Sequence, residues 1–180
     1  MADFNLNEAT AVLTRTPAAL DALLRGLPDV WVRGNEGEST WSAFDIVGHL
    51  AVAERTDWMP RVLTLLEHGE EQPFPPFDRF AQLHENRDKS LEQVLDEFAE
   101  LRRESLAALA SLNLQVDDLS RRGKHPSFGA VTLSELLACW AVHDLNHLHQ
   151  LARVMAHPYR EAVGPWSAYL GVLQCNGHGA

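Results

Sequence analysis

Two histidines near the carboxyl end of the chain lie four residues apart in an apolar stretch. Residues 136–151 read LLACWAVHDLNHLHQL, which places His143 and His147 at this spacing. Four residues turn a helix by about 400°, so the two imidazoles stand one above the other, about 40° apart. The spacing predicts either a shared metal site or a pair of core histidines satisfied by neighbouring side chains.

The same helix face carries residues that should point toward the core. Steps of three and four residues join the two histidines to a stripe formed by Leu136, Trp140, Gln150 and Val154. Such a stripe is typical of the inward face of a bundle helix, so we predict that both imidazoles point inward. The spacing alone is a weak signal, because the nine histidines of the chain would give roughly 0.4 such pairs by chance.

His49 is the residue that we predict as a third ligand. It lies in the almost wholly apolar stretch 44–52, where a buried imidazole needs a hydrogen-bonding partner or a metal. Three imidazoles leave a divalent ion with an open coordination position, which lowers the pKa of a bound water or thiol. The remaining histidines fall in or beside predicted loops, at a helix end or off the stripe: His68, His84, His125, His149, His157 and His178.

Helical patterns dominate the chain and predict an all-α fold. We expect a single domain over residues 1–180, built as a four-helix bundle with a short extra C-terminal helix that begins near Gly164. Prolines should interrupt the first helix at Pro17 and kink or break the second at Pro60. The long helices are expected over residues 7–26, 43–68, 91–112 and 133–157.

Capping patterns mark three helix starts. Ser90 with Gln93 and Thr132 with Glu135 form capping boxes. Asp45, three residues after Ser42, is interpreted as a helix cap, although it also lies one turn before His49 and could orient that ring.

Three segments are expected as loops: residues 28–40, the proline-rich connection 69–80, and a polar stretch that holds Gly123, Pro126 and Gly129. The connection 69–80 is long enough to serve as a wall or lid over a site.

Other polar residues near the histidines have competing interpretations. Gln150 could hydrogen-bond a ligand or be satisfied by the backbone. Cys139, one turn before His143, is interpreted as a small buried thiol, with metal ligation as the alternative. Asp144 should pair with a neighbouring helix, and Glu54 lies too far around its helix from His49 to ligate the same ion.

The composition excludes several function classes. A formal net charge of −10 opposes binding to nucleic acid. Cys139 and Cys175 form no disulfide framework, and the first residues lack a secretory pattern, so we expect a cytoplasmic protein. No apolar run is long enough to cross a membrane. A zinc-peptidase function is also disfavoured, because Asp144 stands where HExxH requires glutamate and Arg153 stands where the extended motif requires a third histidine.

The order and spacing of several short motifs resemble the DinB/YfiT superfamily of metal-dependent proteins. The motifs are Trp41-Ser42, Asp45-Ile46-Val47-Gly48-His49-Leu50, Glu54, Trp58, His143-Asp144-x-x-His147-x-x-Gln150 and Gly164-Pro165-Trp166-x-x-Tyr169-Leu170. The resemblance covers nearly the whole chain. It implies a divalent metal, zinc or nickel, held at one end of the bundle by His49, His143 and His147. The family name refers to DNA damage, a stress response, and implies no DNA binding.

The resemblance also implies a chemistry. Characterised members use the metal to activate a low-molecular-weight thiol, such as bacillithiol or mycothiol, for S-transfer to an electrophile or for isomerisation. Relatives are often dimers, so a homodimer is expected. The alternatives are a metal-dependent hydrolase, a bundle that binds metal or a small ligand without turnover, and histidines that only stabilise the core.

Overall fold

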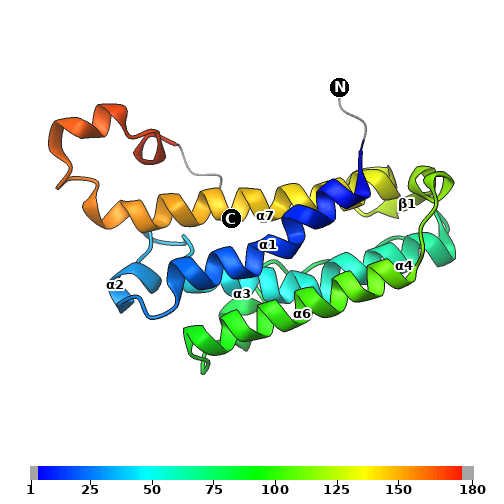
Figure 1. Cartoon of the computed structure of the whole chain (residues 1–180), viewed down its shortest axis with the longest axis horizontal. Coiled ribbons are helices and arrows are strands. Elements are labelled where there is room, and N and C mark those ends of the chain that lie inside the picture. The colour runs from blue at the N-terminus through cyan, green and yellow to red at the C-terminus, as the bar shows by residue number, and fades with distance from the viewer. Residues whose placement is uncertain (1–3, 176–180) are drawn as a thin grey trace.

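The computed structural model describes residues 4–175; residues 1–3 and 176–180, which include His178, lie outside the described part. Four long helical rods form a bundle (Figure 1). The first and third rods, α1 and α6, are each packed against a neighbour on either side, and α3 contacts both α6 and α7. The predicted four-helix bundle is therefore confirmed. The rods are α1 (Leu6–Leu24), α3 (Ala43–Ala53) continued by η1 (Glu54–Trp58) and α4 (Met59–His68), α6 (Leu91–Ser111) and α7 (Leu133–Ala156).

The predicted helix starts are all present. Ser42, Ser90 and Thr132 each cap a helix through a reciprocal capping box. In the first box, the Asp45 carboxylate accepts hydrogen bonds from the Ser42 backbone N–H at 2.9 Å and from its hydroxyl at 2.7 Å. Asp45 therefore caps the helix, while His49 Nδ1 has no hydrogen-bond partner.

The predicted interruption of the first helix is wrong, because α1 runs through Pro17 without a break. A proline inside a helix has no N–H for the carbonyl four residues earlier, which here belongs to Leu13. Arg102 of α6 supplies the missing donor: its Nη1 lies 2.8 Å from the Leu13 carbonyl oxygen. A contact between helices thus compensates for a local defect.

The second rod continues past Pro60 because the helix widens into a π-helical turn just before this proline. Residues Glu54–Trp58 form a π-helical turn, and Pro60 then lies in the first turn of α4, where a missing N–H is tolerated. Turns of this kind redirect side chains and are frequent at functional sites. This turn holds Asp57 and Trp58, both of which line the pocket described below.

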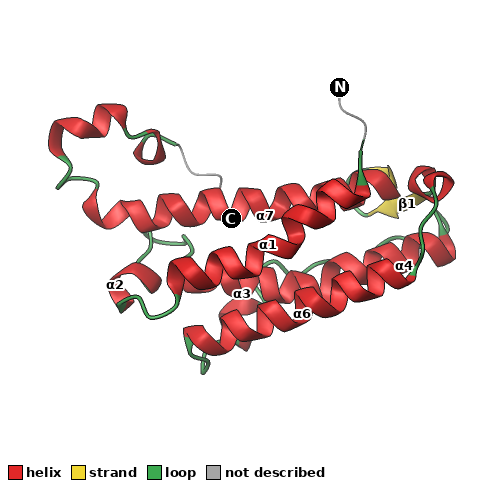
Figure 2. Cartoon of the chain, in the orientation of Figure 1, coloured by secondary structure: helices red, strands yellow, loops and turns green. Residues whose placement is uncertain are grey.

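A β-hairpin occupies part of the polar stretch expected as a loop. Its strands, β1 (Arg122–His125) and β2 (Gly129–Thr132), are antiparallel and lie at one end of the bundle (Figure 2). The strands are short and lack an alternating pattern, so the sequence gives no signal for them. The Phe74 backbone N–H donates to the Lys124 carbonyl at 2.9 Å. A Cβ on Gly123 would lie 2.9 Å from the Phe74 ring, so this glycine permits the connection 69–80 to pack closely on the hairpin.

The remaining elements are short. The expected loop 28–40 contains one helical turn, and the extra C-terminal helix takes the form of two 3₁₀ segments, the first of which begins at Gly164 as predicted. Within residues 4–175, no helix combines the length and apolarity that a membrane crossing requires. The short helices are α2 (Asp29–Val32), α5 (Gln82–Glu85), η2 (Val116–Ser120), η3 (His157–Tyr159), η4 (Gly164–Tyr169) and η5 (Gly171–Leu173).

Polar side chains divide the core into two apolar clusters. In α6, buried Arg102 lies between Phe98, a member of one cluster, and Leu109, a member of the other. In α7, Asp144 and His147 interrupt the apolar residues in the same way. Burying polar groups in the middle of a bundle costs free energy unless they find partners, so this layer needs a specific explanation.

Candidate metal centre

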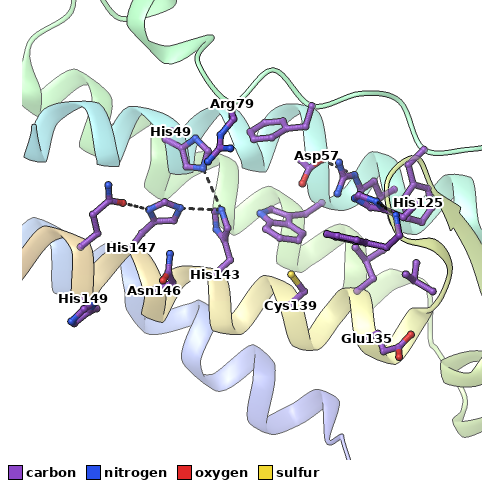
Figure 3. Close-up of a pocket in the computed structure, with 18 of the residues that line it drawn as sticks. His49, Asp57, Arg79, His125, Glu135, Cys139, His143, Asn146, His147 and His149 are labelled. Atoms are coloured by element: carbon purple, nitrogen blue, oxygen red, sulfur yellow. Dashed lines mark hydrogen bonds and ion pairs between the residues drawn. The ribbon is translucent and has the colours of Figure 1, made fainter. Parts of the chain in front are cut away.

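The three predicted ligands come together although they lie on two separate helices. His49 projects from α3, while His143 and His147 project from α7 toward it (Figure 3). The Nε2 atom of His143 lies 3.3 Å from that of His49 and 3.1 Å from that of His147. Within the described chain, these three residues form a group of potential metal-ligating side chains whose ligand atoms all lie within 4.8 Å of one another.

The spacing of the ring nitrogens fits a shared ion. Zn–N bonds of about 2.0–2.1 Å in a tetrahedral arrangement would place pairs of nitrogen ligands about 3.3 Å apart. The two Nε2–Nε2 distances in the structure, 3.1 and 3.3 Å, match this separation. Among residues 4–175, three imidazoles and no fourth ligand belong to this group, which is the donor set of a site with an open position.

Burial keeps the three rings in the neutral form that binds metals. It lowers the pKa of His49 from 6.5 to about 3 and that of His143 to about 2, and it also lowers the pKa of His147. The positive charge that a proton would place on one ring also disfavours protonation of its neighbours. Metal binding at neutral pH would therefore displace no protons from these rings.

Neighbouring side chains fix the ring orientations. The Gln150 side-chain oxygen lies 2.8 Å from His147 Nδ1, so it accepts the Nδ1 proton and leaves Nε2 free to ligate. Gln150 thus hydrogen-bonds one of the predicted ligands, the first of the two roles considered for it. Trp41 packs on the His49 ring with centroids 4.7 Å apart, and Trp58 meets the His143 ring edge-on at 5.1 Å.

The histidines form one part of the wall of a cavity of about 760 Å³. The connection 69–80 forms another part of the wall, through Phe74, Phe77 and Arg79, as the sequence predicted. The hairpin closes a further side with His125 and Phe128, whose rings stack with centroids 4.4 Å apart. The cavity is thus lined by tryptophan, phenylalanine and histidine rings together with several charged and amide side chains.

Several lining residues carried no signal in the sequence. Asp57 is one of them: burial raises the pKa of this carboxyl to about 6, although Arg61 lies 2.7 Å away and opposes the change. Cys139 was expected to be a buried thiol, but its side chain is exposed at the cavity and does not belong to the histidine group. The surrounding cavity walls nevertheless desolvate the Cys139 thiol in part, which raises its pKa and disfavours the thiolate that would bind a metal.

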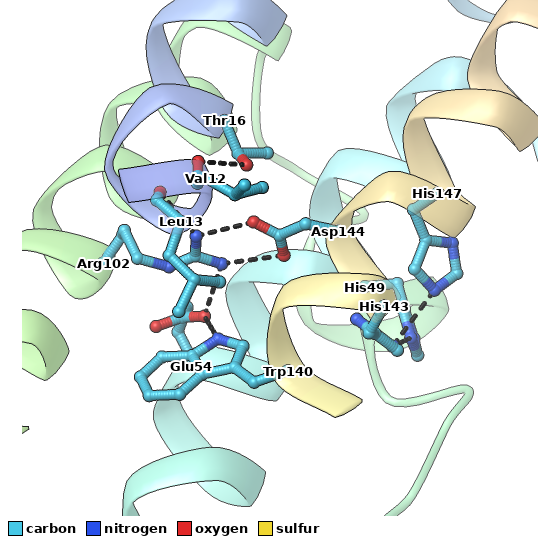
Figure 4. Close-up of polar contacts among 10 residues, drawn as sticks. All are labelled: Val12, Leu13, Thr16, His49, Glu54, Arg102, Trp140, His143, Asp144 and His147. Carbon is cyan, nitrogen blue, oxygen red and sulfur yellow. Dashed lines mark hydrogen bonds and ion pairs between the residues drawn. The ribbon is translucent and has the colours of Figure 1, made fainter. Parts of the chain in front are cut away.

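A second polar cluster lies on the opposite side of α7 (Figure 4). Arg102 donates two hydrogen bonds to Asp144, at 2.6 and 2.9 Å, and forms an ion pair with Glu54 at 2.7 Å. The Trp140 indole N–H also donates to Glu54, at 2.8 Å. As predicted, Asp144 pairs with a neighbouring helix and Glu54 takes no part in the histidine group. Arg102 was not foreseen, because nothing in the sequence around it distinguishes it from its neighbour Arg103, the other arginine of α6.

Burial and ion pairing shift the pKa values of this cluster in opposite directions. Burial raises the pKa of Glu54, and the guanidinium of Arg102 only partly offsets the rise. Burial by itself would lower the pKa of Arg102, but the two carboxylates outweigh it and raise that pKa. Arg102 therefore stays charged, and it ties α3–η1, α6, α7 and the Leu13 carbonyl of α1 together.

Comparisons with known proteins agree with this architecture. Among solved structures, the chain is similar to YfiT from Bacillus subtilis, described as a probable metal-dependent hydrolase with an unusual four-helix bundle topology. The two share 22% sequence identity and superpose with a TM-score of 0.69 over 87% of this chain and 90% of that one. No protein with curated annotation matches the chain. The family model of the DinB superfamily matches residues 13–151, so the chain belongs to the DinB superfamily.

Proposed function

We propose that this protein is an enzyme that depends on one divalent metal ion, held by His49, His143 and His147. The observation that carries the proposal is the convergence of three neutral Nε2 atoms in the wall of a large cavity. When bound there, a divalent ion keeps an open position and makes water or a thiol a nucleophile near neutral pH. Zinc, and nickel as the alternative, suit imidazole ligands.

The chain's own residues would prepare the site. Gln150 holds His147 in the tautomer that ligates, and Trp41 and Phe77 pack around His49, where they exclude water from one side of the ring. Asp57, with a pKa of about 6, is the lining carboxyl best suited to exchange a proton near neutral pH. It lies beside Arg61, which would stabilise the ionised form after proton release.

Hydrolysis is the reaction that we put first. The site offers an open position next to a substrate-sized cavity, and the similar structure of YfiT is described as that of a probable metal-dependent hydrolase. Transfer of a low-molecular-weight thiol is the second candidate. The cavity of about 760 Å³ favours it, because this volume can admit both a thiol and an electrophile.

Metal analysis followed by cobalt substitution tests the proposal. The purified protein should hold one zinc or nickel ion per chain, lose it to a chelator and recover it on addition of metal. In the cobalt-loaded protein, bacillithiol, mycothiol or glutathione should produce a sulfur-to-metal charge-transfer band if the thiol reaction is correct. Absence of the band, together with metal-dependent cleavage of ester or amide substrates, would favour hydrolysis. A protein that binds no divalent metal would refute both candidates.

A further inference from the structure

The arginines that line the cavity are paired with carboxylates, with one exception beside the histidines. Arg61 pairs with Asp57 at 2.7 Å, and Arg153 pairs with Glu36 at 2.7 Å. Glu135 keeps its negative charge and is held in the cap of α7 by Thr132, where the hairpin joins the helix. Near the histidines, an arginine without a carboxylate partner therefore has a large influence on which ligands enter.

Arg79 is the exception. It lines the cavity, and within residues 4–175 no carboxylate lies close enough to form an ion pair with it. Its guanidinium lies 5.7 Å from the centre of the Phe80 ring. Figure 3 shows the side chain beside His49, extending from the connection 69–80 toward the histidines.

This charge lies next to the proposed metal ligands, because Arg79 lines the same cavity as the three histidines and its side chain lies beside His49 (Figure 3). The three ligands are neutral, so a bound divalent ion would add to the charge of Arg79 instead of being balanced by a carboxylate. This end of the cavity therefore attracts anions although the chain as a whole carries a charge of −10.

The rest of the cavity is suited to an apolar group. Phe77 and Phe74 both line the cavity, and the Phe77 ring lies 5.5 Å from that of His49. Phe74 meets His125 edge-on, and His125 stacks on Phe128, which is 79% exposed at the rim. An aromatic wall thus leads away from the charged end.

We propose that Arg79 binds the negative group of the substrate, and that the substrate is an organic anion whose apolar body lies along this aromatic wall. The proposal rests on the proposed function only for the presence of the metal beside Arg79. A guanidinium can bind a carboxylate through two parallel hydrogen bonds, which would fix the substrate's orientation relative to the histidines.

Calorimetric titration with two matched probes tests the role of Arg79. Phenylacetate carries a carboxylate, and phenylacetamide has nearly the same shape without the charge. In the zinc-loaded protein, Arg79→Gln should weaken phenylacetate binding about tenfold or more, the effect of losing a charged hydrogen bond. It should change phenylacetamide binding less than twofold. Arg33→Gln is the control, because Arg33 is also exposed and lies over an aromatic ring, Phe44, but outside the cavity.

The same titrations test the role of Arg79 separately from the proposed metal site. Chelator-treated protein should bind phenylacetate more weakly, and Arg79→Gln should still weaken this binding. The role of Arg79 is therefore tested in the metal-free protein as well, and failure to bind zinc would refute the metal site alone. Acetate should bind at least tenfold more weakly than phenylacetate because it lacks the apolar body. The proposal is overturned if wild-type protein binds no phenylacetate, if Arg79→Gln weakens both aromatic probes equally, or if acetate binds as well as phenylacetate.

Discussion

The two sides of α7 carry polar clusters that differ in what the protein itself provides. His143 and Asp144 are neighbours in the sequence, yet one faces the cavity and the other faces the buried guanidinium of Arg102 (Figure 4). The Arg102 cluster is compensated within the protein by opposite charges. The histidine cluster consists of three like groups, with Nδ1 of both His49 and His143 unpaired. We infer that the first cluster supports the fold and the second is left incomplete for a ligand.

The largest effect should come from removing Arg102. Arg102→Met leaves two buried carboxylates without a cation and the Leu13 carbonyl without a donor, so we expect the free energy of unfolding to fall by about 3–5 kcal/mol. Denaturant titration measures this change. Arg103→Met, a neighbouring substitution at an exposed site, should change it by less than about 0.5 kcal/mol. Equal effects of the two substitutions would show that the Arg102 cluster does not stabilise the fold.

Removing one histidine should affect zinc affinity far more than it affects the stability of the fold. His143→Ala should reduce zinc affinity at least about 100-fold, because a three-imidazole site becomes a two-imidazole site. The unfolding free energy of the metal-free protein should change much less than in Arg102→Met, since no buried charge loses its partner. Competition with a chromophoric chelator gives the affinity, and the exposed His84→Ala is the matched control. Unchanged zinc affinity in His143→Ala would show that the ligands are misassigned.

The histidine cluster should also make the stability of the metal-free protein depend on pH. His49 and His143 take up protons near pH 6.5 when unfolded, but only near pH 3 and pH 2 when folded. Their contribution to the stability of the metal-free protein is therefore present above pH 6.5 and is lost as the pH falls toward 3. The loss is about 1.4 kcal/mol per pH unit for each ring. Denaturant titrations between pH 7 and pH 5 should show a shallower slope in His143→Ala than in the wild type, and equal slopes would contradict the assignment.

The smallest of these effects should come from the residue that orients a ligand. Gln150→Ala removes the acceptor of the His147 Nδ1 proton, and we expect zinc affinity to fall about tenfold, the usual cost of losing such support. Asn146→Ala, a change at another cavity-lining position on α7, is the control and should leave the affinity within twofold. If both variants bind zinc like the wild type, the hydrogen bond to Gln150 does not contribute to metal binding.

Local sequence was sufficient for much of the fold and for selecting the three histidines that the structure brings together. The starts of three long helices were predictable because a capping residue and its partner lie three positions apart and satisfy backbone groups within one turn. The direction of His143 and His147 followed from the apolar stripe that contains them. His49 could be selected because an imidazole in an apolar helix requires a partner. Each of these inferences depends on residues that are close together in the chain.

Other features were decided only by contacts between distant segments. Pro17 looks like a helix break until Arg102, on another helix, supplies the missing donor to Leu13. The hairpin at 122–132 has no periodic pattern, and its place depends on Phe74 packing over Gly123. Arg79 is an ordinary loop arginine in the sequence and lies beside the histidines only because the connection 69–80 folds over them. Periodicity records which side of a helix is buried, whereas the tertiary structure determines which distant group lies opposite that side.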